Sequence, residues 1–198
     1  MKDRRDAILD VAISLAEEGG FDNVRQRDVA AHAGVALGTL YKRFRSKEDI
    51  LVAALDRETE TLERRMEVKP AVGATPLDRV VHLFQLVTRG MCKKPKYARA
   101  VLRAVASGEP EVAGKVAAYQ DRMTGLIIAA LRGVGRLGPK DAPSKAPSKT
   151  EKTLAFALQQ IWFASLVGWS AGLLSPAQVV EQMRLTGAIL MRGVEGES

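Results

Sequence analysis

Residues 34–47 read GVALGTLYKRFRSK, which places glycine, threonine, tyrosine and four basic side chains within one short segment. Gly34 is suited to end one helix in the left-handed conformation, and the residues after it resume a helical pattern. Leu40 and Phe44 are four positions apart, so they share a face and can anchor a helix in a small core. The run therefore predicts a short helix that is fixed by its apolar side and presents polar and basic side chains outward.

The residues before this run predict a helix-turn-helix. Apolar residues with helical spacing at positions 8, 12, 15 and 16 indicate a first helix, which Gly19 and Gly20 end. A second helix is expected at about 25–32 and a third at about 36–44, joined by the tight turn at Gly34. Such a motif places its last helix in the major groove of DNA, while flanking groups hold phosphates.

Several residues of GTLYKRF are suited to contact DNA. Gly38 allows close approach of the backbone, Thr39 can hydrogen-bond to a base or a phosphate, and Leu37 offers an apolar contact to a thymine methyl group. The other candidate contacts are Tyr41, Lys42, Arg45 and Lys47. Val29, Ala33 and Val35 are expected to complete the small core with Leu40 and Phe44. Spacing by itself leaves open that the run is only a solvated basic surface.

The rest of the chain also shows helical spacing and almost no strand-like alternation. Ser46, with Asp49 three residues on, predicts the start of a long fourth helix. Further helices are expected at about 76–93, 95–106, 110–133, 151–173 and from Pro176 onward, with a mobile loop at 133–150. We therefore expect an all-α protein with a three-helix head at 1–47, ending in the first turn of the fourth helix. A body of about six helices should occupy 48–198.

Charge suggests a polyanionic partner, because the formal net charge is +7 and the isoelectric point is near 9.7. Residues 24–47 carry six basic side chains and one acidic one, whereas residues 89–152 carry fourteen basic and five acidic groups. The excess of basic side chains in residues 89–152 either keeps the protein soluble or surrounds the mouth of a pocket for an anionic effector. The residues considered for that pocket mouth are Arg89, Lys93, Lys94, Lys96, Arg99 and Arg103.

Several classes of function find no support in the sequence. Cys92 is the only cysteine and the two histidines are far apart, so neither a disulfide nor a metal site is expected. We find no catalytic constellation and no phosphate-binding glycine loop, and we expect neither enzymatic activity nor a cofactor. The charged N-terminus and the lack of a long apolar run favour a cytoplasmic protein without membrane contact.

The segment from residue 6 to residue 56 resembles the DNA-binding region of the tetracycline-repressor (TetR) family. The resemblance rests on the order of DVA, AGV, GTLYKRF and SKEDIL. It implies an all-helical, homodimeric, ligand-responsive repressor that binds an operator in double-stranded DNA. It also implies that Thr39, Tyr41, Lys42 and Lys47 occupy positions that usually contact DNA.

The sequence departs from the family pattern at two helix starts. Arg25 stands where Ser or Thr usually caps the second helix, and Asn23 is an alternative cap. Ala36 stands where Ser is usual before the recognition helix, so one capping or phosphate hydrogen bond should be absent. Arg25 and Arg27 thereby become candidates for additional DNA contacts, or are simply solvated.

The combination of VALGTLYKRFRSK, GATPLDR and IWFASLVGW is most similar to actinobacterial regulators of steroid catabolism. This closer likeness implies an effector that is a coenzyme A thioester of a sterol-derived acid. A sequence-specific DNA-binding protein without small-molecule control is the alternative function.

Two sets of body residues follow from apolar patterning. The candidate effector-binding residues are Phe84, Val87, Met91, Leu102, Met123, Ile127, Phe156, Trp162 and Phe163, for each of which ordinary core packing is the alternative. Apolar residues surround the helix at 156–169, so one side should face the subunit's own core and another a partner subunit, with the last helix added to that interface. A purely intrachain core is the alternative. The candidate interface residues in these two helices are Leu158, Leu166, Trp169, Val180, Met183, Gly187 and Leu190.

Overall fold

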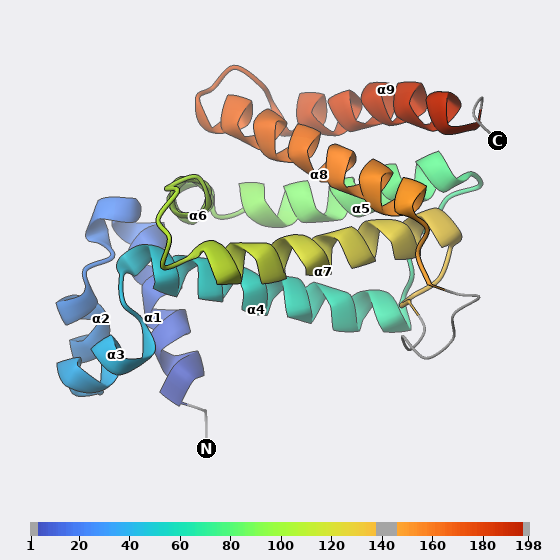
Figure 1. Ribbon diagram of the computed structural model, residues 1–198. Helices are drawn as coiled ribbons and strands as arrows, with labels where there is room; N and C mark the ends of the chain where they lie inside the picture. Colours follow the sequence, from blue (N-terminus) through green and yellow to red (C-terminus); the bar gives the residue numbers. More distant parts are fainter. Residues whose placement is uncertain (1–3, 138–145, 196–198) are drawn as a thin grey trace. The chain divides into compact units, whose positions relative to one another are not determined.

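A computed structural model describes residues 4–137 and 146–195, and within these ranges the chain is helical and contains no strand. The all-α prediction is confirmed (Figure 1). In chain order the elements are α1 (Arg4–Gly19), the short 3-10 helix η1 (Phe21–Asn23), α2 (Gln26–His32), α3 (Leu37–Arg43), α4 (Lys47–Val68), α5 (Pro76–Cys92), α6 (Pro95–Val105), α7 (Ala113–Arg132), α8 (Lys149–Ser170) and α9 (Pro176–Glu195). Positions 138–145 of the predicted loop at 133–150 lie outside the described residues.

The chain divides into two compact units. The first unit comprises Met1–Glu58 with Met91–Tyr119, and the second comprises Thr59–Gly90 with Gln120–Ser198. The first therefore contains α1 to α3, the beginning of α4, all of α6 and the beginning of α7. The predicted domain boundary after residue 47 falls within the first unit, because α4 continues through it. As a statement about domains, that boundary remains a prediction.

The first unit is built on a small apolar core. Leu40 and Phe44 are almost completely buried, as the spacing of the opening run indicated, and Val29 is buried with them. Ala33 and Val35 are half-buried at the rim of this core. Gly34 has a φ of +65°, the left-handed conformation expected at the end of α2. The helix-turn-helix is thus fixed from within by a few apolar side chains.

The helix starts of the first unit follow the sequence with one exception. The Asp49 N–H donates to Ser46 Oγ at 3.1 Å, so Ser46 caps α4 as predicted. Neither Arg25 nor Ala36 provides a side-chain cap for α2 or α3. Asn23 does not replace Arg25 as a cap, because its Nδ2 donates instead to the Leu15 carbonyl at the end of α1.

The second unit is organised by capped helices and an apolar interior. Thr75, Ser148 and Ser175 each accept a hydrogen bond from the backbone N–H three residues on, which starts α5, α8 and α9. The last helix begins with Pro176 in its first turn, as predicted. In this unit α8 and α9 pack side by side (Figure 1). The described helices include none that is long and apolar enough to cross a membrane.

Candidate nucleic-acid interface

The outward face of α3 carries the residues expected to read DNA. Gly38, Thr39 and Lys42 are exposed, and Tyr41 is 48% exposed despite its large aromatic ring. Leu37 is half-buried at the start of the helix. Because Leu40 and Phe44 fix the opposite face, these side chains are displayed on a rigid element, as base recognition requires.

Basic side chains surround this helix in the first unit. Arg25, Arg27 and Arg45 are exposed, whereas the side chain of Lys47 is only 29% exposed. The reason is that Lys47 Nζ lies 3.9 Å from the centroid of the Phe21 ring and 3.6 Å from Asp22 Oδ1. The structure thus brings Lys47 against η1, a contact that the sequence pattern did not predict.

The start of α4 is held by a buried carboxylate. Asp49 is 4% exposed and accepts a hydrogen bond from the Arg45 N–H at 3.0 Å. Lys115 of α7 forms an ion pair with the other oxygen of Asp49, and its Nζ lies 4.9 Å from the centroid of the Phe44 ring. The turn that carries Arg45 and Lys47 is therefore tied to α7 through Asp49.

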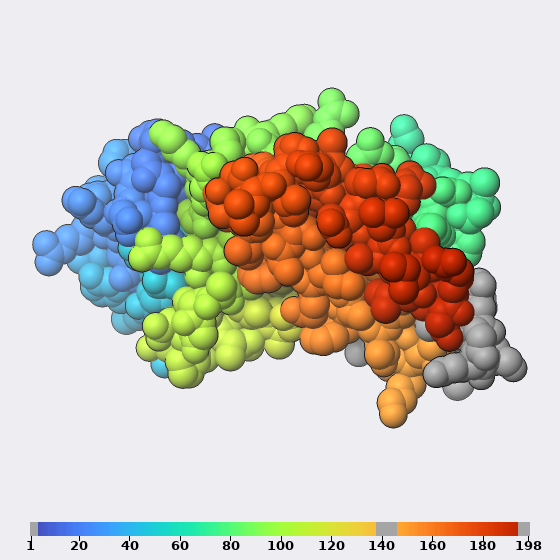
Figure 2. All heavy atoms as spheres, turned by 90° about the horizontal axis from the view of Figure 1, so that it is seen from above, coloured from blue at the N-terminus to red at the C-terminus, as the bar shows by residue number. Residues whose placement is uncertain are grey.

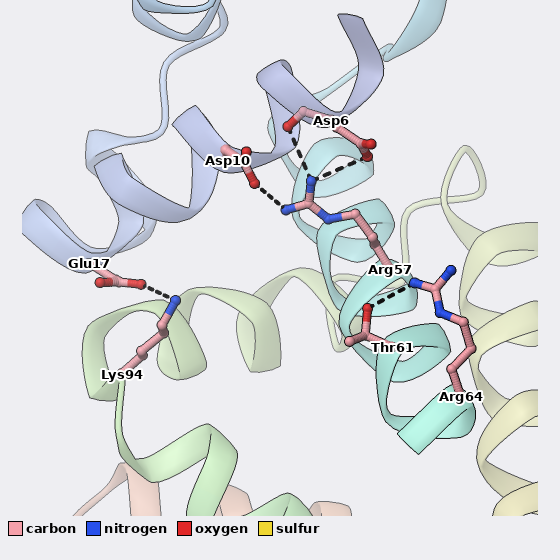
Figure 3. A network of polar contacts seen from close by, with 7 residues as sticks. All are labelled: Asp6, Asp10, Glu17, Arg57, Thr61, Arg64 and Lys94. Carbon is pink, nitrogen blue, oxygen red and sulfur yellow. Dashed lines mark hydrogen bonds and ion pairs between the residues drawn. The ribbon is translucent and has the colours of Figure 1, made fainter. Parts of the chain in front are cut away.

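Helix α1 is fixed to α4 by Arg57. Its guanidinium donates to Asp10 Oδ1 at 2.7 Å and to the Asp6 carbonyl at 3.1 Å (Figure 3). These partners outweigh the opposing effect of burial and raise the pKa of Arg57. The contacts hold the first helix of the head against the long helix that leaves it.

Much of the basic charge in and just before α6 is used inside the first unit. Lys94 Nζ lies 2.6 Å from Glu17 Oε1 (Figure 3), and Lys96 Nζ donates to the Glu18 carbonyl at 2.7 Å. Arg103 likewise lies 3.5 Å from Asp22 Oδ1. The basic segment after residue 89 thus serves in part to hold α6 against α1 and η1. These contacts account for three of the residues considered for the mouth of an effector pocket.

A hollow in the first unit is lined by Arg5, Arg43, Phe44, Ala53, Asp56, Lys115 and Ala118. Three of these side chains are cationic and one is a carboxylate. None of the residues expected to bind an effector lines it. The hollow therefore adds no support for the predicted effector site.

Comparison with known proteins identifies the family. The model of the N-terminal region of bacterial regulatory proteins of the tetR family matches residues 8–54. The model described as the tetracyclin repressor-like C-terminal domain matches residues 73–190. The chain belongs to the TetR family.

Relatives within the TetR family are transcriptional regulators. The HTH-type transcriptional repressor KstR of Rhodococcus jostii (strain RHA1) is 32% identical over 190 residues, which cover 96% of this chain and 84% of the relative. This match agrees with the likeness to steroid-catabolism regulators seen in the sequence. The crystal structure of a TetR regulator from Rhodococcus sp. RHA1 superposes with a TM-score of 0.80 at 25% identity, covering 96% of both chains.

A second solved structure shares the fold of this TetR-family chain. Thermus thermophilus FadR, a TetR-family repressor in complex with lauroyl-CoA, superposes with a TM-score of 0.72 at 19% identity. The match covers 96% of this chain and 94% of FadR. At this identity the likeness establishes the shared fold.

The predicted effector residues are divided between the two units. Met91 and Leu102 belong to the first unit, and the others belong to the second. In the second unit the ring centroids of Phe84 and Trp162 lie 5.8 Å apart. Met123 and Ile127 are also buried, and Val87 and Phe163 are half-buried.

Phe156 differs from the other predicted effector residues of the second unit. It is 49% exposed, which favours contact with a partner molecule over a place in an interior effector site.

Polar groups inside the second unit were missed by the sequence analysis. Thr88 is 1% exposed and its Oγ1 accepts a hydrogen bond from the Trp162 indole N–H at 2.9 Å. Gln159 is 3% exposed and lies 3.4 Å from Thr124 Oγ1 through its amide oxygen. The two glutamines that interrupt the apolar run 154–169 are the signal that could have revealed Gln159. An apolar interior with a few polar groups is typical of a small-molecule site.

The predicted dimer residues are also divided by their burial. Leu158, Leu166, Met183 and Gly187 are buried within the protomer, and a Cβ at Gly187 would lie 2.9 Å from Leu77 Cδ1 of α5. Trp169, Val180 and Leu190 are half-buried. Gly187 therefore allows α5 and α9 of the same unit to approach closely. We predicted that the four buried residues lie in a dimer interface. This stays a prediction, and their burial within the protomer does not favour it.

Other side chains of α8 and α9 are better placed for a partner. Phe156 and Val167 of α8 are 49% and 44% exposed, and Leu185 and Ile189 of α9 are 54% and 62% exposed. The two helices form a broad continuous surface in the space-filling view (Figure 2). Large exposed apolar side chains on adjacent helices are typical of an oligomer interface.

Proposed function

We propose that this TetR-family protein is a ligand-responsive transcriptional repressor that acts in the cytoplasm. It binds a near-palindromic operator as a homodimer and is released by a small apolar or acyl-CoA-type effector. The observation that carries the proposal is the exposed outer face of α3, held rigid by buried Leu40 and Phe44. On it, Thr39, Tyr41 and Lys42 are the side chains that would meet base edges and phosphates.

The second unit supports the proposed effector class. Its apolar interior contains Thr88 and Gln159 as buried hydrogen-bonding groups, beside Trp162 and Phe84. FadR, which shares the fold, was solved in complex with lauroyl-CoA, and the likeness of this sequence to steroid-catabolism regulators implies a steroid-derived acyl-CoA in particular. An effector that binds one arrangement of the helices more tightly shifts the population away from the DNA-binding state. Operator binding must then weaken effector binding by the same factor.

A homodimer is supported by the exposed apolar residues of α8 and α9. A two-fold axis through that surface would pair Phe156, Val167, Leu185 and Ile189 with the same surface of a second copy. Such a dimer presents two recognition helices to two half-sites, so the operator should be nearly palindromic.

Selection on random duplex DNA at physiological salt tests the DNA-binding part of the proposal. The expected result is enrichment of a two-fold symmetric site. Thr39→Ala should lose the preference for that site while keeping non-specific binding, because Thr39 is placed to meet bases. Ala31→Ser, which changes an exposed residue on α2, is the matched control. Enrichment of no symmetric site would contradict the proposal.

Release of the selected site by effectors tests the second part. Lauroyl-CoA and a steroid-acid CoA thioester should release the protein, whereas coenzyme A alone should not. Effector binding should also change the fluorescence of Trp162, whose indole N–H donates to Thr88. In Trp162→Phe the remaining tryptophan is Trp169, so a comparison with the wild type isolates the Trp162 signal. If no small molecule releases the complex, the alternative of a DNA-binding protein without small-molecule control is favoured.

A further inference from the structure

Two cations from distant parts of the chain meet at η1. Lys47 at the start of α4 and Arg103 in α6 both lie against Phe21, at 3.9 Å and 4.1 Å from the ring centroid. Both also approach Asp22 Oδ1, at 3.6 Å and 3.5 Å. Because the two distances share one oxygen, the charged nitrogens are at most about 7 Å apart.

The exposure of this cluster argues against a mainly structural role. The side chains of Asp22 and Arg103 are 79% and 62% exposed. Ion pairs and cation–π contacts at such exposed positions contribute little to stability. One carboxylate faces two cations, so the cluster keeps a positive charge that an anion can approach.

The location of the cluster points to the identity of that anion. Lys47 follows α3 by four residues and is expected to contact a DNA phosphate, while Arg25 lies three residues after Asp22. Arg103 is therefore placed beside the DNA-binding surface although it lies far along the chain in α6. Its planar guanidinium can bind two phosphate oxygens at once, which a lysine cannot do.

We propose that Arg103 is a DNA backbone contact that acts beside Lys47, so that the phosphate-binding surface extends from the helix-turn-helix into α6. Asp22 and Phe21 hold the two cations close together when DNA is absent. The inference deepens the proposed function and rests on it. It also makes α6 part of the DNA-binding surface, so that any shift of α6 relative to η1 would move a DNA contact.

The test measures how binding depends on salt, since each phosphate contact contributes about 0.9 to the slope of log K against log salt. The probes are a labelled duplex with the selected operator and a scrambled duplex of equal length. The variants are Arg103→Gln and, as a benchmark, Lys47→Gln. Lys69→Gln removes one exposed positive charge from the second unit and controls for net charge.

In a dimer, Arg103→Gln should lower the slope by about 1.8, because both subunits lose a contact. When the salt concentration rises from about 50 to 200 mM, the wild type should therefore lose about tenfold more affinity than Arg103→Gln does. The loss should be equal on both probes, since phosphate contacts carry no sequence information. Arg103→Lys should recover most of the slope, and Lys69→Gln should keep the wild-type slope.

An unchanged slope in Arg103→Gln would overturn the inference, whether or not affinity falls. A lowered affinity with unchanged slope and a lower melting temperature would assign Arg103 a structural role only. Failure of the proposed function looks different, because the wild type would then not distinguish the selected duplex from the scrambled one. The scrambled duplex would still report the salt slope in that case.

Discussion

At the scale of single residues, the head depends on a buried charge that is satisfied from another helix. Asp49 is 4% exposed and holds both the Arg45 N–H and the Lys115 ammonium. The sequence identified Asp49 as part of the start of α4, and the hydrogen bond from its N–H to Ser46 confirms this. It did not identify Lys115, because the two residues are brought together only by the packing of α7 on the head.

Lys115→Met should therefore destabilise the protein by about 1–3 kcal/mol. This is less than for a fully buried pair, because the Lys115 side chain is 39% exposed. The destabilisation arises because the buried Asp49 carboxylate loses its cationic partner. Chemical denaturation followed by circular dichroism measures the change. Lys115→Arg is the matched control and should retain most of the stability; equal loss in both variants would contradict a role for the charge.

A second residue-scale prediction concerns Tyr97 of α6. Its hydroxyl is buried and makes no hydrogen bond of good geometry among the described residues, although the Glu58 carboxylate lies close enough to interact with it. Burial and the nearby charge of Glu58 raise the pKa of Tyr97 well above its usual value. A buried unsatisfied polar group is costly, so Tyr97→Phe should raise the free energy of unfolding by about 1 kcal/mol. A clear loss of stability in urea denaturation would instead show that the hydroxyl has a partner.

At the scale of elements, local sequence accounts for most helix boundaries. The cap Ser46, the start at Pro176 and the positive-φ residue Gly34 were predicted from residue type and spacing. Ser148 was not predicted as a cap, and α8 begins at Lys149, before the predicted position 151. The predicted end of α8 at residue 173 was too late. The helix stops at Ser170, because the chain turns at Gly172 with a φ of +78°.

The start of α8 gives a prediction about pH. Hydrogen bonds from Arg132 and from the Ser148 backbone lower the pKa of Glu151 from 4.5 to about 2. Because the folded-state pKa is depressed, the stabilisation is present above pH 4.5 and is lost as the pH falls toward about 2.

Glu151→Gln should accordingly lower the stability by about 1 kcal/mol at neutral pH and have little effect near pH 2. Thermal melts of both proteins across this range measure the difference. Glu111→Gln, which alters an exposed carboxylate before α7, should melt like the wild type throughout. A difference between Glu151→Gln and wild type that persists at the lowest pH would show that the charge is not the cause.

At the scale of the whole molecule, burial separates side chains of the protomer core from those available to a partner. Ile189 is 62% exposed on α9, whereas Leu158 on α8 is completely buried. Ile189→Lys should therefore convert the dimer to monomer while the isolated fold persists. Leu158→Ala should destabilise the protomer by about 2–5 kcal/mol without directly removing interface contacts. Analytical ultracentrifugation and denaturation distinguish the two effects, and a dimeric Ile189→Lys protein would contradict the proposed surface.

The sequence by itself determined the all-α class, the helix-turn-helix and the family, because these depend on local spacing, capping and contiguous motifs such as GTLYKRF. Tertiary structure alone decided that α6 joins the head unit and that Arg103 lies beside Lys47. It also decided which apolar residues of α8 and α9 are exposed. The physical reason is that a helix with apolar residues on several sides does not specify which side each neighbour covers. Contacts between residues distant in sequence leave no periodic signal in the chain.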